Sequence, residues 1–462
     1  MVVKQCVFYD VGILNNHLKE VTKMQKKSLL LTAVLAAATC AQAADVQVYG
    51  VIDTGFDYTH ASYDTTLKGK WQQTPYAVNV SKSSSAFKLA SGKRMGNRFG
   101  LKGSEKISDS ITAGFVLEGG FDLDNGGLGE KDKLFNRQAD LYVDTTAGEF
   151  AFGRVGTLAS GIGTYGIFHK FSDNYNGGWG DHIGGAKHAF VSSGRIDNSV
   201  TYVSPEFAGV KLYGQYSFNQ SGEQQDKVRE NNRYAAVGAT YEIGKLNLVG
   251  VFDKTFYDNA PINYTGLATP KKSKIADRWS LNLGGSYDFD VVKVFAAYQH
   301  ADHAKDFGGY KGKTYVELFN ASGMADAVKT LPNPLNVKYD DAARFDGMIN
   351  HANGFKTDTV LIGADVPLFN GVFKAQATYG KAKFHDAYSG SNIGNAGLKI
   401  KTMGVALGYD HPLSKRTQLY VGGAYDFTKY DSSTIFKGSK DVNTSRVKVK
   451  TFEAIAGLVH KF

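Results

Sequence analysis

Apolar and polar residues alternate along most of the chain after residue 44. In the first such segment Val48, Ile52 and Phe56 share one parity, whereas Asp53 and Asp57 share the other. Because successive side chains of a β-strand point to opposite faces, this period of two predicts strands with one apolar face. The same alternation marks sixteen segments: 45–58, 94–107, 110–123, 133–146, 149–156, 195–204, 208–219, 231–243, 246–256, 277–290, 291–303, 355–368, 371–384, 398–411, 415–430 and 446–462.

The connections between these segments alternate in length. Short links such as 147–148 and 244–245 alternate with long ones at 59–93, 157–194, 257–276, 304–354 and 431–445. Short turns at one end and long loops at the other predict an up-and-down β-barrel with two unlike ends. No Gly/Ser-rich linker divides residues 44–462, so we expect one domain, with 315–331 as a candidate short helix.

The number of strands decides which way the apolar face points. A barrel of sixteen strands encloses a lumen too wide for side chains to fill, so the lumen is wet and the apolar face meets lipid. A β-structure in lipid must also close, because an open edge would leave backbone groups unpaired. The pattern therefore favours a transmembrane barrel, with a secreted β-sandwich or β-solenoid as the alternative.

Composition agrees with an all-β protein and excludes several others. The chain has 53 Gly, 26 Tyr and 29 Phe but 8 Pro, a balance typical of strands and tight turns. The net charge is +9, without a long basic run, so no nucleic-acid partner is expected. Both cysteines, Cys6 and Cys40, lie before residue 44, so the remainder has no thiolate metal site and no disulfide.

The first 43 residues carry an export signal. Residues 24–43 combine Lys26 and Lys27, an apolar stretch of about ten residues and the cleavage pattern Ala-Gln-Ala, as signal peptides do. A short buried helix or a lipoprotein signal at Cys40 fits less well. We expect residues 1–23 to be a non-native upstream extension and the mature chain to be 44–462.

Several stretches resemble the Gram-negative general porins, particularly the type found in beta-proteobacteria. They are the segments VYGVID (48–53), RFGLKGSE (98–105), GRIDNSVTY (194–202), SPEFAG (204–209), YDHPLSKRTQLY (409–420) and GLVHKF (457–462). The resemblance implies a 16-stranded antiparallel transmembrane β-barrel with an inward-folded constriction loop, in the outer membrane. It also implies a homotrimer, contact with outer-membrane lipid and lipopolysaccharide, and assembly by the barrel assembly machinery through Phe462.

The same resemblance implies which residues line the pore. The constriction loop corresponds to 157–194, which is rich in glycine and contains Asp173 and Asp181. Alternation assigns further acids, Glu118 and Asp197, and a basic wall of Arg98, Lys102 and Arg195 to the lumen. Arg154 shares parity with apolar neighbours, so its place in the pore requires a break at Gly153. Arg137 has outward parity and is left out of the pore, with a subunit-interface role in its place.

These residues predict passive diffusion of ions and small hydrophilic solutes, with a weak anion preference. We expect no cofactor, metal site or catalytic function. No nucleophile elbow, zinc-protease motif or phosphate-binding loop is present, and the spacing of His169, His182 and His188 is not typical of metal ligands. The alternative functions are an outer-membrane adhesin or a barrel enzyme.

Overall fold

Antiparallel strands make up nearly all of the regular structure. The computed structural model describes residues 46–71, 74–176, 189–192, 194–227, 230–257, 275–308, 354–385, 393–436 and 442–462. Its elements are β1 (Gln47–Trp71), β2 (Thr74–Ser91), β3 (Arg98–Ser108), β4 (Ile111–Gly120), β5 (Gln138–Thr145), β6 (Gly148–Gly156), α2 (Phe168–Ser172), β7 (Arg195–Val203), β8 (Val210–Ser217), β9 (Arg233–Ile243), β10 (Leu246–Phe256), β11 (Arg278–Asp288), β12 (Lys293–Ala304), β13 (Phe355–Leu368), β14 (Gly371–Phe384), β15 (Ile393–Pro412), β16 (Thr417–Phe436) and β17 (Val442–Lys461).

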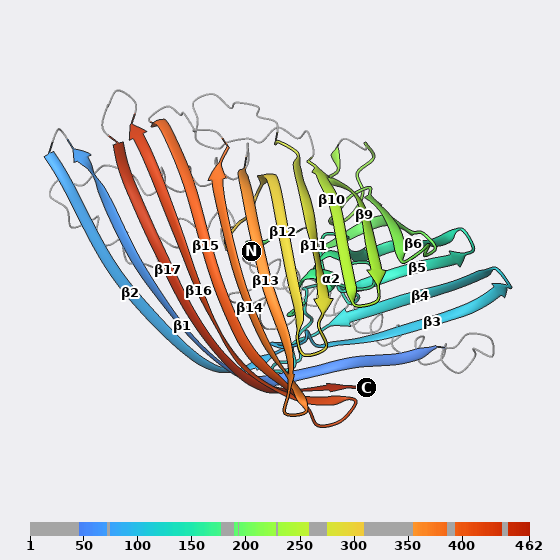
Figure 1. The fold of residues 1–462 in the computed structure, drawn as a ribbon. Coiled ribbons are helices and arrows are strands. Elements are labelled where there is room, and N and C mark those ends of the chain that lie inside the picture. Colours follow the sequence, from blue (N-terminus) through green and yellow to red (C-terminus); the bar gives the residue numbers. More distant parts are fainter. Residues whose placement is uncertain are drawn as a thin grey trace, which may run out of the picture.

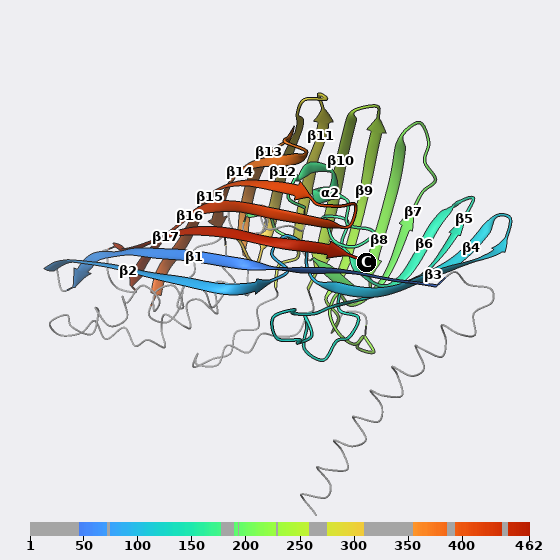
Figure 2. The same ribbon diagram turned by 90° about the horizontal axis from the view of Figure 1, so that it is seen from below.

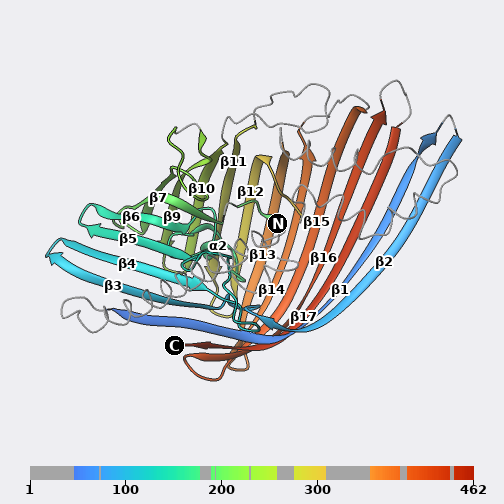
Figure 3. The same ribbon diagram turned by 180° about the vertical axis from the view of Figure 1, so that it is seen from behind.

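The strands close into a ring. From β3 to β17 each strand pairs with the next one in the chain, and β1 closes the ring by pairing with β3 at its start and with β17 along its length. β2 pairs with the outer part of β1 and is additional to the ring. The predicted 16-stranded antiparallel barrel is therefore confirmed, and Figures 1 to 3 show the ring from three sides.

The two ends of the chain meet at the seam of the barrel. Gly50 and Phe462 exchange two backbone hydrogen bonds of 3.1 Å, and Figure 2 shows the end of β17 lying beside β1. The Phe462 ring occupies the space that a side chain at position 50 would need, because a Cβ there would lie 2.3 Å from it. Glycine at position 50 thus lets the terminal aromatic ring pack on the first strand.

The prediction of a loop over 59–93 is wrong. β1 continues to Trp71, and β2 returns antiparallel to it in full register from Thr74 to Ser91. The chain alternates too weakly there to reveal a strand, since Ser, Thr and Lys occur on both faces. At about 3.4 Å per residue, the 25 residues of β1 are more than twice the length needed to cross a bilayer. The outer part of the hairpin therefore needs no apolar face.

Other boundaries move in the same way. β16 and β17 extend into the predicted 431–445 loop, so 437–441 are the only residues between them. In contrast, β5 begins at Gln138, five residues later than predicted. The expected signal peptide, the upstream extension and the candidate helix at 315–331 lie outside the described residues.

The outward face of the ring is apolar over a continuous band. Exposed fractions reach 61% for Val237, 64% for Ile362 and 55% for Leu407, on strands spread around the barrel. Such a surface is too large for a water-soluble monomer and requires lipid or a neighbouring subunit. Among the described helices, none is both long enough and apolar enough to span a bilayer.

Candidate pore constriction

The segment after β6 enters the barrel. Leu158, Ile167 and Phe168 are at most 3% exposed and pack in one cluster with Val249 and Val251. Both valines belong to the inward face of β10, because the alternate residues of that strand are exposed outside. α2 contacts β10, β11 and β12, and Figure 3 shows it within the ring. The described part of the predicted constriction loop, 157–176, therefore folds inward.

Two glycines of the wall make room for this loop. A Cβ at Gly284 would lie 2.5 Å from the Ser172 Cβ, and one at Gly363 would lie 2.3 Å from Asn174 Oδ1. Real Cβ atoms do not approach other atoms so closely, so larger residues here would push the loop into the lumen. The wall and the loop are thus fitted to each other.

The far end of the loop is fixed to β13 and β14. The Asn174 side chain donates hydrogen bonds to the carbonyl oxygens of Ala364 and Ala375, both at 3.1 Å, and Tyr175 Oη donates to the Lys374 carbonyl at 2.9 Å. Burial raises the pKa of Tyr175, so its hydroxyl stays protonated and remains a donor. The loop therefore crosses the lumen from β6 to β13 and β14.

A second inward segment, 92–97, joins β2 to β3. Lys93 Nζ lies 2.8 Å from Asp57 and 2.6 Å from Glu453, and Arg94 pairs with Asp410 at 2.8 Å. Burial opposes the charge of Lys93, but the two carboxylates outweigh it and raise its pKa. These acids were not among the predicted site residues, although Asp57 shows the inward parity. The segment fills the lumen beside β1, β15 and β17.

Three arginines lie close together near one glutamate, at the ends of β3, β4, β5 and β7. Arg137 Nε lies 2.7 Å from Glu118 Oε1, and Arg98 Nε lies 3.6 Å from Glu118 Oε2. Tyr49 Oη donates to the same Oε2 at 3.1 Å, and Arg195 Nε donates to the Arg137 carbonyl at 2.8 Å. We call Arg98, Arg137, Arg195 and Glu118 the arginine cluster. Since one carboxylate cannot neutralise three guanidinium groups, the cluster carries a net positive charge.

Arg137 is the residue that strand parity excluded. It lies directly before β5, whose first residue is Gln138, so the alternation of that strand does not govern its side chain. Its ion pair with Glu118 brings it into the arginine cluster. The signal that could have identified it is its position at a strand end, where parity ceases to apply.

Arg154 lies in a separate group of charges. Gly153 has φ +142° and the pairing of β6 with β7 shifts directly after it, so the predicted break at Gly153 is present. The Arg154 guanidinium pairs with Asp197 and, at 3.0 Å, with Glu130, while its Nε donates to the Asn136 carbonyl at 2.8 Å. Arg154 and Asp197, both predicted for the pore wall, therefore neutralise each other.

Lys102 and Asp173, two further residues predicted for the pore, lie outside the arginine cluster. Lys102 is exposed and its Nζ lies 5.6 Å from the centre of the Tyr49 ring, one contact away from Glu118. Asp173 is 3% exposed, and it accepts hydrogen bonds from Tyr175 N at 2.9 Å and Gln376 Nε2 at 2.5 Å. The expectation that Asp173 faces a basic wall is wrong, because its carboxylate holds the loop to β14. Asp181 lies outside the described residues.

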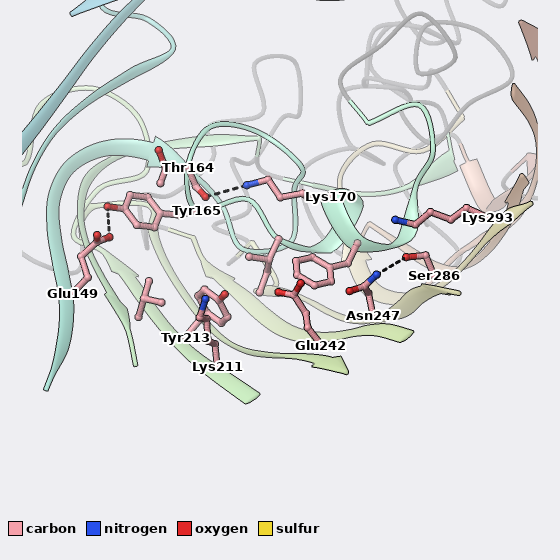
Figure 4. Close-up of a pocket in the computed structure, with 13 residues that line it drawn as sticks. Glu149, Thr164, Tyr165, Lys170, Lys211, Tyr213, Glu242, Asn247, Ser286 and Lys293 are labelled. Atoms are coloured by element: carbon pink, nitrogen blue, oxygen red, sulfur yellow. Dashed lines mark hydrogen bonds between the residues drawn. The ribbon is translucent and has the colours of Figure 1, made fainter. Parts of the chain in front are cut away.

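A polar cavity continues from the loop toward the short turns. It has a volume of about 470 Å³ and lies between the loop and the inner faces of β6 to β12 (Figure 4). Three lysines and two glutamates line it: Lys170, Lys211, Lys293, Glu149 and Glu242. Partial desolvation by the surrounding loop and wall lowers the pKa of Lys170, which donates a hydrogen bond of 3.4 Å to the Thr164 carbonyl. This lower chamber is thus polar and slightly basic.

One group of side chains has the donors of a metal site. The ligand atoms of Asp302, His303 and His385 lie within 4.8 Å of one another at the outer ends of β12 and β14. His303 has φ +56° at a shift in the pairing of β12 with β13, where the regular alternation of neighbouring side chains is interrupted.

Of the three histidines in the predicted constriction loop, His169 pairs with Asp173 at 3.4 Å, and His182 and His188 lie outside the described residues.

Comparison with known proteins identifies the family. The family model for the Gram-negative porins matches residues 31–431. The chain belongs to the Gram-negative porin family. An outer membrane porin of Bordetella pertussis is 31% identical over 411 residues, which cover 87% of this chain and 94% of that protein. Outer membrane porin protein 32 of Delftia acidovorans is 26% identical, covering 92% of this chain and 95% of that protein.

Solved structures agree with the fold of this porin. An anion-selective porin from Comamonas acidovorans superposes with a TM-score of 0.50 at 21% identity, covering 91% of this chain and all of that one. The beta-proteobacterial resemblance is confirmed by the relatives from Bordetella and Delftia. This porin is an outer-membrane β-barrel channel, and the adhesin and barrel-enzyme alternatives are not favoured.

Proposed function

We propose that this porin passes small hydrophilic solutes by passive diffusion with a weak preference for anions, set by the arginine cluster. The main support is the excess of three guanidinium groups over one carboxylate. Arg137 Nε lies 2.7 Å and Arg98 Nε lies 3.6 Å from the Glu118 carboxylate. Fixed positive charge beside a water-filled passage raises the local concentration of anions and lowers that of cations. The chemistry involves no bond making, so we propose no catalytic role.

The expected preference is weak for two reasons. Water fills the lumen, so the dielectric constant is high and each charge contributes little. Salt screens what remains, since the Debye length is about 8 Å at 0.15 M. The slightly basic lower chamber adds to the preference for anions. The porin of similar fold from Comamonas acidovorans is anion-selective, which agrees with this proposal.

A planar-bilayer recording of the purified protein tests it. With a tenfold gradient of dilute KCl, the reversal potential should have the sign of anion preference and approach zero as salt rises. The double variant Arg98→Gln, Arg195→Gln should move the reversal potential toward cations and keep the conductance. A strongly cation-selective wild-type channel would overturn the basic-wall proposal, and an unchanged potential in the variant would remove these two arginines from the neck.

We also propose a homotrimer, in contact with lipopolysaccharide, that is assembled through its C-terminal strand. The exposed apolar band needs subunit or lipid contact, and Phe462 directly follows β17 and pairs with Gly50 at the seam. Unheated protein should run on an SDS gel at about three times its denatured mass, and deleting Phe462 should lower the amount in the outer membrane. A molar mass of one chain, measured by light scattering in mild detergent, would overturn the trimer.

We propose 24–43 as the signal peptide, with N-terminal sequencing of the exported protein as the test.

A further inference from the structure

The outward faces of β13 to β17 carry two parallel rows of basic side chains. In one row the cross-strand register aligns Lys448, Lys429, Lys401 and Lys381; in the next it aligns Arg446, Lys399, Lys383 and Lys356, with Asp431 between the first two. We call these eight cations the lysine face. At about 4.8 Å between strands, five strands spread it over roughly 20 Å.

These side chains point away from the lumen. Their neighbours along each strand are buried on the inside: Ala382 is 4% exposed, Ile400 0% and Val447 0%. Because neighbours in a strand point to opposite faces, Lys383, Lys399 and their row face outward. The lysine face therefore takes no part in the channel, and neither the proposed pore residues nor the lower chamber touch it.

The lysine face lies directly against the apolar band. On β13 to β16 the cross-strand row next to it consists of Val360, Tyr379, Met403 and Phe427, the first three being 43–47% exposed, and on β17 this row ends in Lys450. The lysines lie on the side of this row nearer the long loops, which is the outer side in an outer-membrane barrel. They are thus at the level where the outer leaflet changes from hydrocarbon to head groups.

The face has far more positive than negative charge. The same two rows contain three carboxylates: Asp64, Asp358 and Asp431. Asp431 forms ion pairs with Lys429 at 2.8 Å and with Arg446 at 2.5 Å, and Asp358 forms one with Lys381 at 3.5 Å. Within the described part of the chain, the other five lysines make no ion pair: Lys356, Lys383, Lys399, Lys401 and Lys448. So many unpaired like charges repel one another unless an anion lies among them.

A groove concentrates part of this charge. It has a volume of about 910 Å³, and its lining includes five cations, Lys68, Lys383, Lys399, Arg446 and Lys448, against two carboxylates, Asp64 and Asp431. The hydroxyl-bearing residues Thr66, Ser433 and Thr444 also line it. Ammonium, guanidinium and hydroxyl donors together are the groups that bind phosphate oxygens in proteins.

We propose that the lysine face binds the phosphate groups of lipid A, the phosphorylated glycolipid anchor of lipopolysaccharide. The acyl chains would lie on the adjacent apolar row, and the phosphorylated sugars would lie in the groove. This proposal rests on the lipopolysaccharide contact proposed above and assigns it a site; it does not depend on ion selectivity. Free phosphate fits less well, because nothing in its chemistry accounts for the apolar row beside the cations.

Binding to the refolded full-length protein in a neutral detergent tests the proposal. Native mass spectrometry would count bound molecules of diphosphorylated lipid A, of the same lipid with both phosphates removed, and of inorganic phosphate. The triple variant Lys383→Gln, Lys399→Gln, Lys401→Gln should bind diphosphorylated lipid A at least about tenfold more weakly than wild type. The control variant Lys106→Gln, Lys245→Gln, Lys415→Gln removes the same charge at the short turns and should bind like wild type.

Four outcomes would overturn the proposal. The first is that the dephosphorylated lipid binds as tightly as diphosphorylated lipid A, and the second is that inorganic phosphate binds as tightly as that lipid. The third is that the control variant loses as much binding as the triple variant. The fourth is that the triple variant loses its oligomeric state in the absence of lipid. The last would make the face a contact between copies of the chain. Single-channel conductance and reversal potential are recorded for the same variant and should not change. A failure of the anion-preference proposal would appear in wild-type recordings, independently of lipid binding.

Discussion

The arginine cluster and the lysine face are both basic, but they hold their charge in different ways. Inside, Arg98, Arg137 and Arg195 are partly buried, and each donates a hydrogen bond: Arg98 to the Gly96 carbonyl at 3.2 Å, Arg137 to Glu118 at 2.7 Å and Arg195 to the Arg137 carbonyl at 2.8 Å. Outside, lysines such as Lys399 and Lys401 are exposed and make no ion pair among the described residues. Guanidinium groups form planar, directed contacts, whereas ammonium groups are mobile point charges. The interior arrangement suits a fixed field, and the exterior one suits an adaptable contact with many anionic groups.

The strongest test of this difference removes each set of charges in turn. Replacing Arg98, Arg137 and Arg195 by Gln leaves Glu118 without its counterions, so we expect the channel to become cation-selective, with the permeability ratio changing several-fold below 0.1 M salt. The triple variant of Lys383, Lys399 and Lys401 carries the same change in charge and should leave the reversal potential at the wild-type value. Equal effects of the two variants would mean that the two surfaces are not on opposite sides of the wall.

Replacing Glu118 by Gln sharpens the role of the cluster's single acid. The amide keeps the shape but removes the negative charge, so anion preference should rise, by about twofold in the permeability ratio at low salt. The ion pair with Arg137 is lost at the same time, and we expect larger fluctuations in the open-channel current. A shift toward cations would show that Glu118 lies away from the ion path.

Asp173→Asn distinguishes an anchoring acid from a pore acid. Since the carboxylate accepts hydrogen bonds from Tyr175 N and Gln376, the variant should weaken loop attachment by about 1–2 kcal/mol and leave selectivity nearly unchanged. Proteolysis of the folded protein within 157–176 would report loop release. A clear change in reversal potential with an intact loop would restore the pore-acid interpretation.

Lys305 provides a buried lysine to compare with the exposed ones. Burial lowers its pKa to about 8, against 10.5 for a free side chain. The unfolded chain therefore binds more protons between these values, and stability should rise with pH over that range, by up to about 3 kcal/mol. The temperature at which the folded band disappears from an SDS gel should increase from pH 7 to 10. Lys305→Met should raise it at pH 7 and remove this part of the pH dependence, whereas Lys401→Met should do neither.

The alternation of side chains determined the architecture without any tertiary information. Because a wide barrel has water inside and lipid outside, each membrane-crossing strand must carry the pattern, and sixteen strands were readable with their order and their two kinds of connection. Arg98, Glu118 and Arg195 were also readable, since they occur on polar faces or in recognisable motifs. The β1–β2 hairpin was not, because beyond the bilayer neither face has to be apolar.

What tertiary structure decided is how the charges combine in the interior. Parity predicts which face of the sheet a strand residue lies on, but it does not apply at strand ends or in loops. It therefore excluded Arg137 from the pore, although Arg137 pairs with Glu118. It also could not predict that the loop residue Asp173 binds Gln376 of β14. Likewise, the sequence predicts both Arg154 and Asp197 as charges of the pore wall, yet their ion pair cancels the two charges. The eight cations of the lysine face are scattered over residues 356–448 and become one surface because strand register aligns them. Local pattern is enough to specify a barrel, whereas a field or a binding face depends on distances between residues far apart in the chain, which folding alone establishes.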